Sequence, residues 1–180
     1  METFTPPKPL TENPRFQQQR RSCLATLDYA ILDAPLTGIV AGFNALSCCF
    51  SLQSCFGHFL YSGQTDEQNL LPLPVGRDID TVEYRIAYLA LCVDNNAAGR
   101  ALIEDLTCAA SIDPQNIQFG CAEWFWQQQI NSYVLQVEPE RFKHQDRAVL
   151  EYAEALRIEH VRNTLFTWLK TRLSSNRPDR

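Results

Sequence analysis

The side chains best suited to chemistry are gathered in one short segment, Gln53–His58. Ser54 supplies a hydroxyl, Cys55 a thiol and His58 an imidazole, and Gly57 lies between the thiol and the imidazole. A thiol beside an imidazole suits either a cysteine nucleophile or a set of soft metal ligands. Backbone N–H groups around a glycine turn also form a nest that holds phosphate or carboxylate. This segment is therefore the candidate functional site.

A metal site would need ligands beyond this segment. Cys48 and Cys49 lie just upstream, so four soft ligands fall between positions 48 and 58. Zinc takes about four such ligands in a tetrahedron. Zinc ribbons normally pair two knuckles across a longer loop, whereas this sequence has one. We therefore interpret Cys48 and Cys49 as packing residues and predict no metal site, with a small zinc-binding protein as an open alternative.

Covalent catalysis by Cys55 would need His58 as a base and an acid to orient the imidazole. The sequence assigns no such acid, and Asp66, Asp78 and Asp80 are candidates only by assumption. We therefore interpret Cys55 as structural and favour a turn that cradles an anionic or nucleotide ligand. Its side-chain hydrogen bonds would come from Ser54 and His58.

The common sequence motifs for nucleotide binding and for catalytic zinc are absent from the sequence. The sequence has no Gly-x-Gly-x-x-Gly loop, no Gly-x-x-x-x-Gly-Lys-Ser/Thr loop and no His-Glu-x-x-His. The run Trp124–Trp126 has the aromatic faces that stack on bases. Because aromatic residues of strands more often pack in the core, we interpret this run as core.

Hydrophobic periodicity predicts the elements that position the segment. It predicts helices over residues 14–32, from Asp33 to about Leu46 with Asp33 as cap and Pro35 in the first turn, from Asn95 or Asn96 to Ala109, and from Asp146 to Leu173. It predicts strands at Phe50–Ser54, Phe59–Tyr61 (as an antiparallel return), Tyr84–Val93, Ile117–Trp126 and Tyr133–Glu138, with a long polar connection at Ser62–Asp80. This order indicates a single α+β domain, with a mainly antiparallel or mixed sheet covered by helices and a long C-terminal helix.

Composition sets broad limits on the protein. A chain of 180 residues suits one domain, expected over 14–173, with a flexible arm at 1–13 and a disordered tail at 174–180. The net charge of −5 argues against a strongly basic nucleic-acid surface. Seven cysteines, an odd number, favour a reducing compartment and hence a cytoplasmic protein. The sequence has no apolar run long enough for a membrane helix, and it leaves the oligomeric state open.

The order of elements and the Ser54–His58 segment resemble the family of tRNA wybutosine-synthesising protein 3. That family opens with a basic helix containing Phe and Leu-Asp, as Phe16, Arg20, Leu27 and Asp28 do here. Its second helix leads to a strand ending Ser-Ser-Cys-Ser-Gly-Arg, which Gln53–His58 matches. Ser54, Cys55 and Gly57 carry over by position, while His58 stands where the family has Arg.

The resemblance implies S-adenosylmethionine-dependent methyl transfer to a nucleobase, in that family a modified guanosine of phenylalanine tRNA. It implies contacts to S-adenosylmethionine from Ser54, Cys55 and Gly57. We expect His58, as general base or hydrogen-bond donor, and Ser54 to be the catalytic residues. The expected partner is a nucleoside-like small molecule or tRNA. A non-enzymatic ligand-binding or regulatory module on the same fold is the main alternative.

Overall fold

The computed structural model describes residues 3–75 and 78–175, and it confirms the α+β prediction. Its strands are β1 (Phe4–Thr5), β2 (Cys49–Cys55), β3 (His58–Leu60), β4 (Thr81–Arg85), β5 (Ala87–Val93), β6 (Ile117–Ala122), β7 (Ser132–Val137) and β8 (Arg147–Glu151). Its α-helices are α1 (Phe16–Thr26), α2 (Thr37–Ala45), α3 (Ala97–Ala110), α4 (Glu123–Gln128) and α5 (Tyr152–Ser175). Short 3-10 turns occur at Tyr29–Ile31, Ala34–Leu36 and Glu140–Phe142. Within the described ranges, none of the helices combines the length and the apolar character that crossing a membrane requires.

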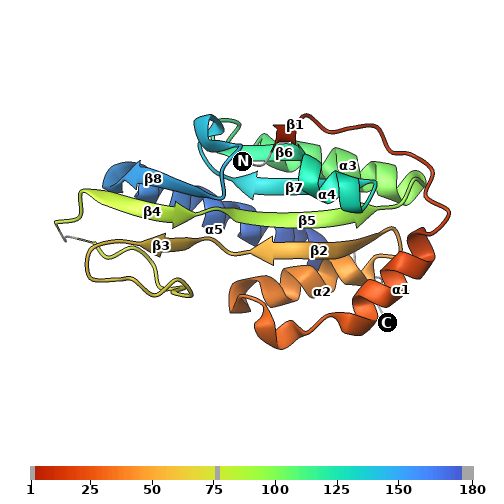
Figure 1. Cartoon of the computed structure of the whole chain (residues 1–180), viewed down its shortest axis with the longest axis horizontal. Coiled ribbons are helices and arrows are strands. Elements are labelled where there is room, and N and C mark those ends of the chain that lie inside the picture. The colour runs from red at the N-terminus through yellow and green to blue at the C-terminus, as the bar shows by residue number, and fades with distance from the viewer. Residues whose placement is uncertain (1–2, 76–77, 176–180) are drawn as a thin grey trace.

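The strands form two antiparallel sheets that lie end to end (Figure 1). The larger sheet has the order β1-β6-β7-β5-β2, and the smaller has the order β3-β4-β8. Two chain segments pass directly from one sheet to the other. Phe56 and Gly57 separate β2 from β3, and Ile86 separates β4 from β5. The two breaks lie side by side, because Cys55 pairs with Tyr88 on one side of them and His58 pairs with Arg85 on the other.

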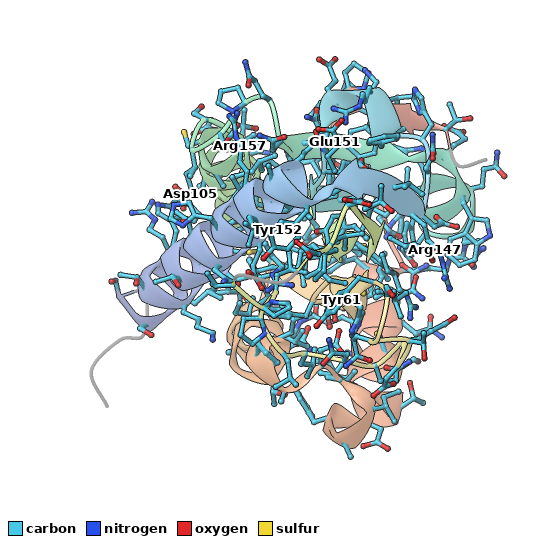
Figure 2. All side chains as sticks on the ribbon, turned by 90° about the vertical axis from the view of Figure 1, so that its left-hand side faces the viewer. Tyr61, Asp105, Arg147, Glu151, Tyr152 and Arg157 are labelled. Carbon is cyan, nitrogen blue, oxygen red and sulfur yellow. The ribbon has the colours of Figure 1, made fainter. Side chains whose placement is uncertain are left out.

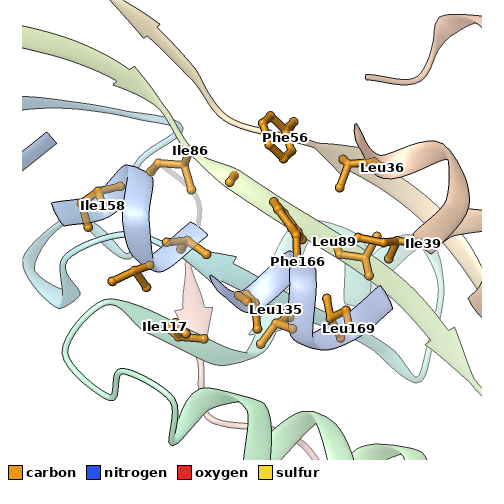
Figure 3. Packing of buried hydrophobic residues seen from close by; sticks show 14 of the residues in the cluster. Leu36, Ile39, Phe56, Ile86, Leu89, Ile117, Leu135, Ile158, Phe166 and Leu169 are labelled. Atoms are coloured by element: carbon orange, nitrogen blue, oxygen red, sulfur yellow. The ribbon is translucent and has the colours of Figure 1, made fainter. Parts of the chain in front are cut away.

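Alternation along β5 divides the larger sheet into two faces. The inner face carries Leu89 and Leu91 and packs against α2, α3 and α5 in the main core (Figure 3). The outer face carries Tyr88, Ala90 and Cys92, which pack with residues of α1 and α4. Because residues paired across antiparallel strands point to the same side, the outer face continues into the smaller sheet through His58 and Arg85.

The last predicted helix is shorter than expected at its N-terminus. Residues 147–151 form strand β8 and only then does α5 begin, with Glu151 directly followed by Tyr152 (Figure 2). The burial of β8 alternates strictly, with Ala148 and Leu150 buried between exposed neighbours, which is the period of a strand. The prediction of one helix from Asp146 to Leu173 was therefore wrong over its first turn and a half.

Two predicted strands have different bounds in the structure. Tyr84–Val93 is divided at Ile86, whose N–H donates to the carbonyl of Asp146 outside either ladder. The segment predicted as strand up to Trp126 instead turns into α4 after Ala122, so the Trp124–Trp126 run is helical. Glu123 in the first turn suits a helix N-terminus. The two predicted strands Ile117–Trp126 and Tyr133–Glu138 lie next to each other, since β6 pairs with β7 in antiparallel fashion and α4 connects them.

Two further boundaries differ from expectation. The helix predicted over 14–32 ends at Thr26, and the second helix starts with a 3-10 turn at Ala34 before α2. The Phe59–Tyr61 return does not pair with β2, because β3 joins β4 in the smaller sheet.

The N-terminal segment expected to be a flexible arm is attached over residues 3–13. Strand β1 pairs with β6, and Thr11 bonds to Asn131 through both its N–H and its hydroxyl. Of the expected tail, Ser174 and Ser175 belong to α5, and the rest lies outside the described residues.

Candidate functional site

The turn between β2 and β3 requires a glycine. Gly57 has φ of +90°, a conformation that side-chain-bearing residues rarely adopt. A Cβ on Gly57 would also lie 2.8 Å from the Cβ of Ala87 and 3.0 Å from the ring of Tyr84. The turn thus packs tightly against β4 and β5. The side chains of Cys55 and His58, on either side of the turn, lie close together.

Three side chains meet at this turn: Asp33, Cys55 and His58. One potential ligand atom from each lies within 4.8 Å of the other two. Nε2 of His58 is 3.3 Å from Oδ2 of Asp33, and Oδ2 also accepts a 2.7 Å hydrogen bond from the N–H of Phe56. His58 and Cys55 are buried, and Asp33 keeps 15% of its side chain exposed. We call these three residues the turn cluster.

The described part of the connection between β3 and β4 contacts the turn cluster at Asn69. Nδ1 of His58 lies 3.1 Å from the backbone oxygen of Asn69. The connection is anchored further along, where the N–H of Leu73 donates to Glu159 and the hydroxyl of Tyr152 donates to the carbonyl of Pro74. Asn69 of this connection is therefore part of the site. Asn69 also has a buried side-chain nitrogen with no hydrogen-bond partner among the described residues.

Asp33 and His58 each stabilise the charged form of the other. The hydrogen bond to Asp33, followed by that to Cys55, raises the pKa of His58 to about 10. Burial acts to raise the pKa of Asp33, but the hydrogen bonds from His58 and from the N–H of Phe56 outweigh it, and the pKa is lowered. His58 is thus an imidazolium at neutral pH. In that state it donates hydrogen bonds, which is one of the two roles that we expected of it, the other being that of a general base.

A buried arginine holds the turn from the inner side. Arg162 of α5 donates to the carbonyl of Gly57 at 2.9 Å, and its guanidinium lies over the ring of Phe56 at 4.1 Å. Glu159, one turn earlier on α5, lies 3.6 Å from the guanidinium. Desolvation lowers the pKa of Arg162, but an arginine stays charged under any ordinary condition.

Ser54 does not join the turn cluster. It pairs with Leu89, so its side chain points to the inner face, whereas Cys55 pairs with Tyr88 and points to the outer face. Of the residues expected to contact a cofactor or take part in catalysis, the structure therefore brings together Cys55, Gly57 and His58. Ser54 lies on the opposite side of the strand.

The other sequence candidates lie elsewhere. Cys49 begins β2 and Cys55 ends it, so their backbones are about 20 Å apart along an extended strand. The thiol of Cys49 donates to the carbonyl of Phe43, and a hydrogen bond with Cys49 lowers the pKa of Cys48 to about 7. The four-ligand set considered from the sequence is therefore divided. The proposed orienting acids Asp66, Asp78 and Asp80 are all exposed.

A cavity of about 590 Å³ opens on the outer face beside the turn cluster. Its aromatic lining comes from Tyr88, Trp124 and Phe125, and its amides come from three glutamines. The full lining is Gln53, Glu67, Arg85, Ile86, Tyr88, Trp124, Phe125, Val134, Gln136, Gln145, Asp146 and Arg147. Gln53 belongs to the expected segment, but Ser54, Cys55, Gly57 and His58 do not line the cavity.

Two arginines and His58 form a row across the smaller sheet. His58 pairs with Arg85, and Arg85 pairs with Arg147. Arg147 forms ion pairs with Glu67 and Glu83, and it projects from β8 on the side of the molecule away from the C-terminal end of α5 (Figure 2). Within residues 3–75 and 78–175, by contrast, neither a hydrogen bond nor an ion pair engages the side chain of Arg85, although its charge contributes to the lowered pKa of Asp33.

Sequence reasoning missed three site residues. Asp33 was interpreted as a helix cap, and its distance along the chain from Cys55 gave no hint of contact. Asn69 acts through its backbone oxygen, which leaves no sequence signal. Arg85 did have a signal, since it is a cation placed inside the apolar run Tyr84–Val93.

Comparisons with known proteins place the chain in no family. No protein-family model matches it, and no curated protein matches it. Among solved structures it is similar to the PH1069 protein from Pyrococcus horikoshii, with 12% sequence identity over 90% of this chain and 93% of that chain and a TM-score of 0.47. A likeness of this strength assigns no function to the chain.

Proposed function

We propose that this protein binds a nucleoside-like ligand that carries an anionic group, in the cavity between Trp124 and Arg85. The observation that carries the proposal is that one cavity combines an exposed aromatic face with a half-buried arginine that has no ion-pair partner among the described residues. A cavity of about 590 Å³ falls in the range of small-molecule sites.

The aromatic side of the cavity suits a planar ring. Trp124 keeps 54% of its surface exposed although it is a large apolar residue, and its ring meets that of Phe125 edge to face at 4.8 Å. Stacking of a base on such a ring contributes about 1–3 kcal/mol. Gln53, which is exposed, supplies an amide donor and an amide acceptor that match the edge of a nucleobase.

The charged side of the cavity suits an anion. Arg85 lies in the row formed with His58 and Arg147. Because carboxylates pair with the other two cations, Arg85 is the member of this row that has no ion-pair partner among the described residues. A guanidinium presents a planar pair of N–H donors that matches a carboxylate or a phosphate. Asp146, also in the lining, supplies a negative charge for a cationic group of the same ligand.

S-adenosylmethionine combines these groups, and the family resemblance makes it the first ligand to test. Its adenine would stack on Trp124, its carboxylate would pair with Arg85, and its ammonium would face Asp146. The proposed reaction is methyl transfer to a nucleobase. This places the ligand in the cavity rather than on Ser54 and the turn, and it gives His58 a supporting role in place of proton abstraction.

Calorimetry with S-adenosylmethionine, S-adenosylhomocysteine and adenosine monophosphate tests binding. Arg85→Gln is expected to weaken binding of each carboxylate or phosphate ligand at least tenfold. The matched control is Arg100→Gln, because Arg100 is exposed on α3, lies outside the cavity lining and donates from its side chain to Asn95. The proposal fails if none of the three ligands binds at millimolar concentration, or if the two variants behave alike.

A non-enzymatic binding module is the second candidate, and the position of His58 favours it. The imidazole is buried and lies outside the cavity lining, so it does not face a ligand bound there. Incubation with methyl-labelled S-adenosylmethionine and a mixture of nucleosides and tRNA separates the two candidates. Label transferred to nucleic acid supports the methyltransferase, and tight binding without transfer supports the module.

A further inference from the structure

The turn cluster has the composition of a metal site that the sequence did not predict. Asp33, Cys55 and His58 offer one carboxylate, one thiol and one imidazole, with a ligand atom of each within 4.8 Å of the others. These are the three ligand types that zinc takes in proteins. The cluster lies outside the cavity lining, so it is a separate site from the proposed ligand pocket.

The distances fit a small tetrahedral ion. Ligand atoms bound to one tetrahedral zinc lie about 3.3–3.6 Å apart, given bond lengths of about 2.0–2.3 Å. Nε2 of His58 and Oδ2 of Asp33 are already 3.3 Å apart. The Cys55-x-x-His58 spacing, with Gly57 at positive φ, is that of a metal knuckle in which a tight turn brings two ligands together.

Neighbouring backbone groups orient the side chains of His58 and Asp33, as such groups orient the ligands of known metal sites. A metal-bound histidine normally donates its other ring N–H to a carbonyl or carboxylate, which fixes the ring. Here Nδ1 lies 3.1 Å from the backbone oxygen of Asn69, which leaves Nε2 for the ion. The carboxylate of Asp33 is held in turn by the N–H of Phe56 at 2.7 Å.

The same contacts argue against a cysteine nucleophile. A nucleophile–histidine–acid relay needs one ring nitrogen on the nucleophile and the other on the acid. In this cluster Nδ1 faces a carbonyl and Nε2 faces the acid, and Cys55 is buried and does not line the cavity. Ligand atoms of a thiol, a carboxylate and an imidazole that all lie within 4.8 Å of one another can instead share one ion.

We propose that Asp33, Cys55 and His58 bind one zinc-like divalent cation, with water in the fourth position. The ion would take a neutral imidazole, a thiolate and a carboxylate as ligands. It joins the segment before α2 to the β2–β3 turn, and so fixes the strand edge next to Arg85. The proposal is independent of the ligand proposed for the cavity.

Cobalt titration of the full chain, first stripped of metal with a chelator, tests the site. We expect one equivalent of Co²⁺ to give the intense visible bands of a tetrahedral ion and a near-ultraviolet thiolate charge-transfer band. Zn²⁺ should displace the cobalt and raise the melting temperature. A spectrum without a thiolate band, or no uptake at millimolar Co²⁺, overturns the proposal.

Variants identify the ligands. Cys55→Ser and the near-isosteric Asp33→Asn should each weaken metal binding more than about 100-fold. Loss of a residue that only orients a metal ligand typically weakens binding by roughly 10- to 100-fold. Cys48→Ser is the matched control, since Cys48 is a buried thiol that lies outside the cluster. Arg85→Gln should leave metal uptake unchanged. The metal site and the ligand cavity are therefore tested independently, and either proposal can fail without the other. A thiolate band kept at full strength in folded Cys55→Ser overturns the assignment.

Discussion

Nε2 of His58 lies 3.3 Å from Oδ2 of Asp33, and this contact joins two segments that the sequence keeps apart. It fixes the turn between the two sheets to the segment that leads into α2. Because His58 also pairs with Arg85 across the strands, the contact supports the charged side of the cavity.

Asp33→Asn should destabilise the metal-free chain by about 3 kcal/mol, because it leaves a buried imidazolium without its carboxylate. Urea unfolding in the presence of a chelator measures this. Asp80→Asn is the control, since Asp80 is exposed and a substitution there should change the free energy of unfolding by less than about 0.5 kcal/mol. Equal effects of the two substitutions would show that the Asp33–His58 contact contributes nothing.

The stability of the metal-free chain should depend on pH through His58. Its pKa is raised to about 10 in the folded state from an ordinary value of 6.5. The stabilisation is therefore fully present below about pH 6.5 and is lost as the pH rises towards 10. The difference in unfolding free energy between the wild type and His58→Gln should shrink across this window. A difference that stays constant or grows with pH contradicts the pairing.

Gly57→Ala should be more damaging than Gly63→Ala. Both glycines have φ of +90°, so both substitutions carry the cost of a strained backbone, about 1 kcal/mol. Only at Gly57 would the new Cβ overlap other atoms, since nothing lies within 4 Å at Gly63. We expect a further loss of about 1–3 kcal/mol at Gly57. Thermal unfolding of the two variants measures the difference, and equal losses would mean that the turn is not tightly packed.

Arg162→Gln should cost about 3–5 kcal/mol, since it leaves Glu159 buried without its partner and removes the bond to Gly57. Arg157→Gln on the same helix is the control. Its ion pair with Asp113 spans 3.5 Å at an exposed position, and such pairs contribute about 1 kcal/mol or less. Chemical unfolding of both variants checks the ordering, and a smaller loss for Arg162→Gln would contradict it.

Sequence periodicity predicted the fold class and most elements, because the apolar stripes of α2, α3 and α5 and the β6–β7 pair are strong local signals. It failed at β8, a short strand that runs directly into a helix, so that its alternation was taken for part of the helical stripe. It also failed at Ile86, where the two sheets meet. A change of sheet within one apolar run depends on contacts with Asp146 and not on the local sequence.

The candidate segment was identified from its residue types, but its environment was not. The pairing of His58 with Asp33 and Asn69 is set by tertiary structure, and it raises the pKa of the imidazole well above its ordinary value. The cavity was also missed, because it forms from side chains of strands β2, β4, β5, β7 and β8 together with α4.

The most direct test of the proposed ligand site is an NMR titration with S-adenosylmethionine that follows the indole N–H signals of the three tryptophans. Trp124 lines the cavity, whereas Trp168 packs on α5 against the main core. The account predicts that the Trp124 signal shifts with saturation, that Trp168 does not move, and that Arg85→Gln raises the ligand concentration at the midpoint of the shift at least tenfold. A titration that leaves Trp124 unmoved, or that moves Trp168 instead, would contradict it.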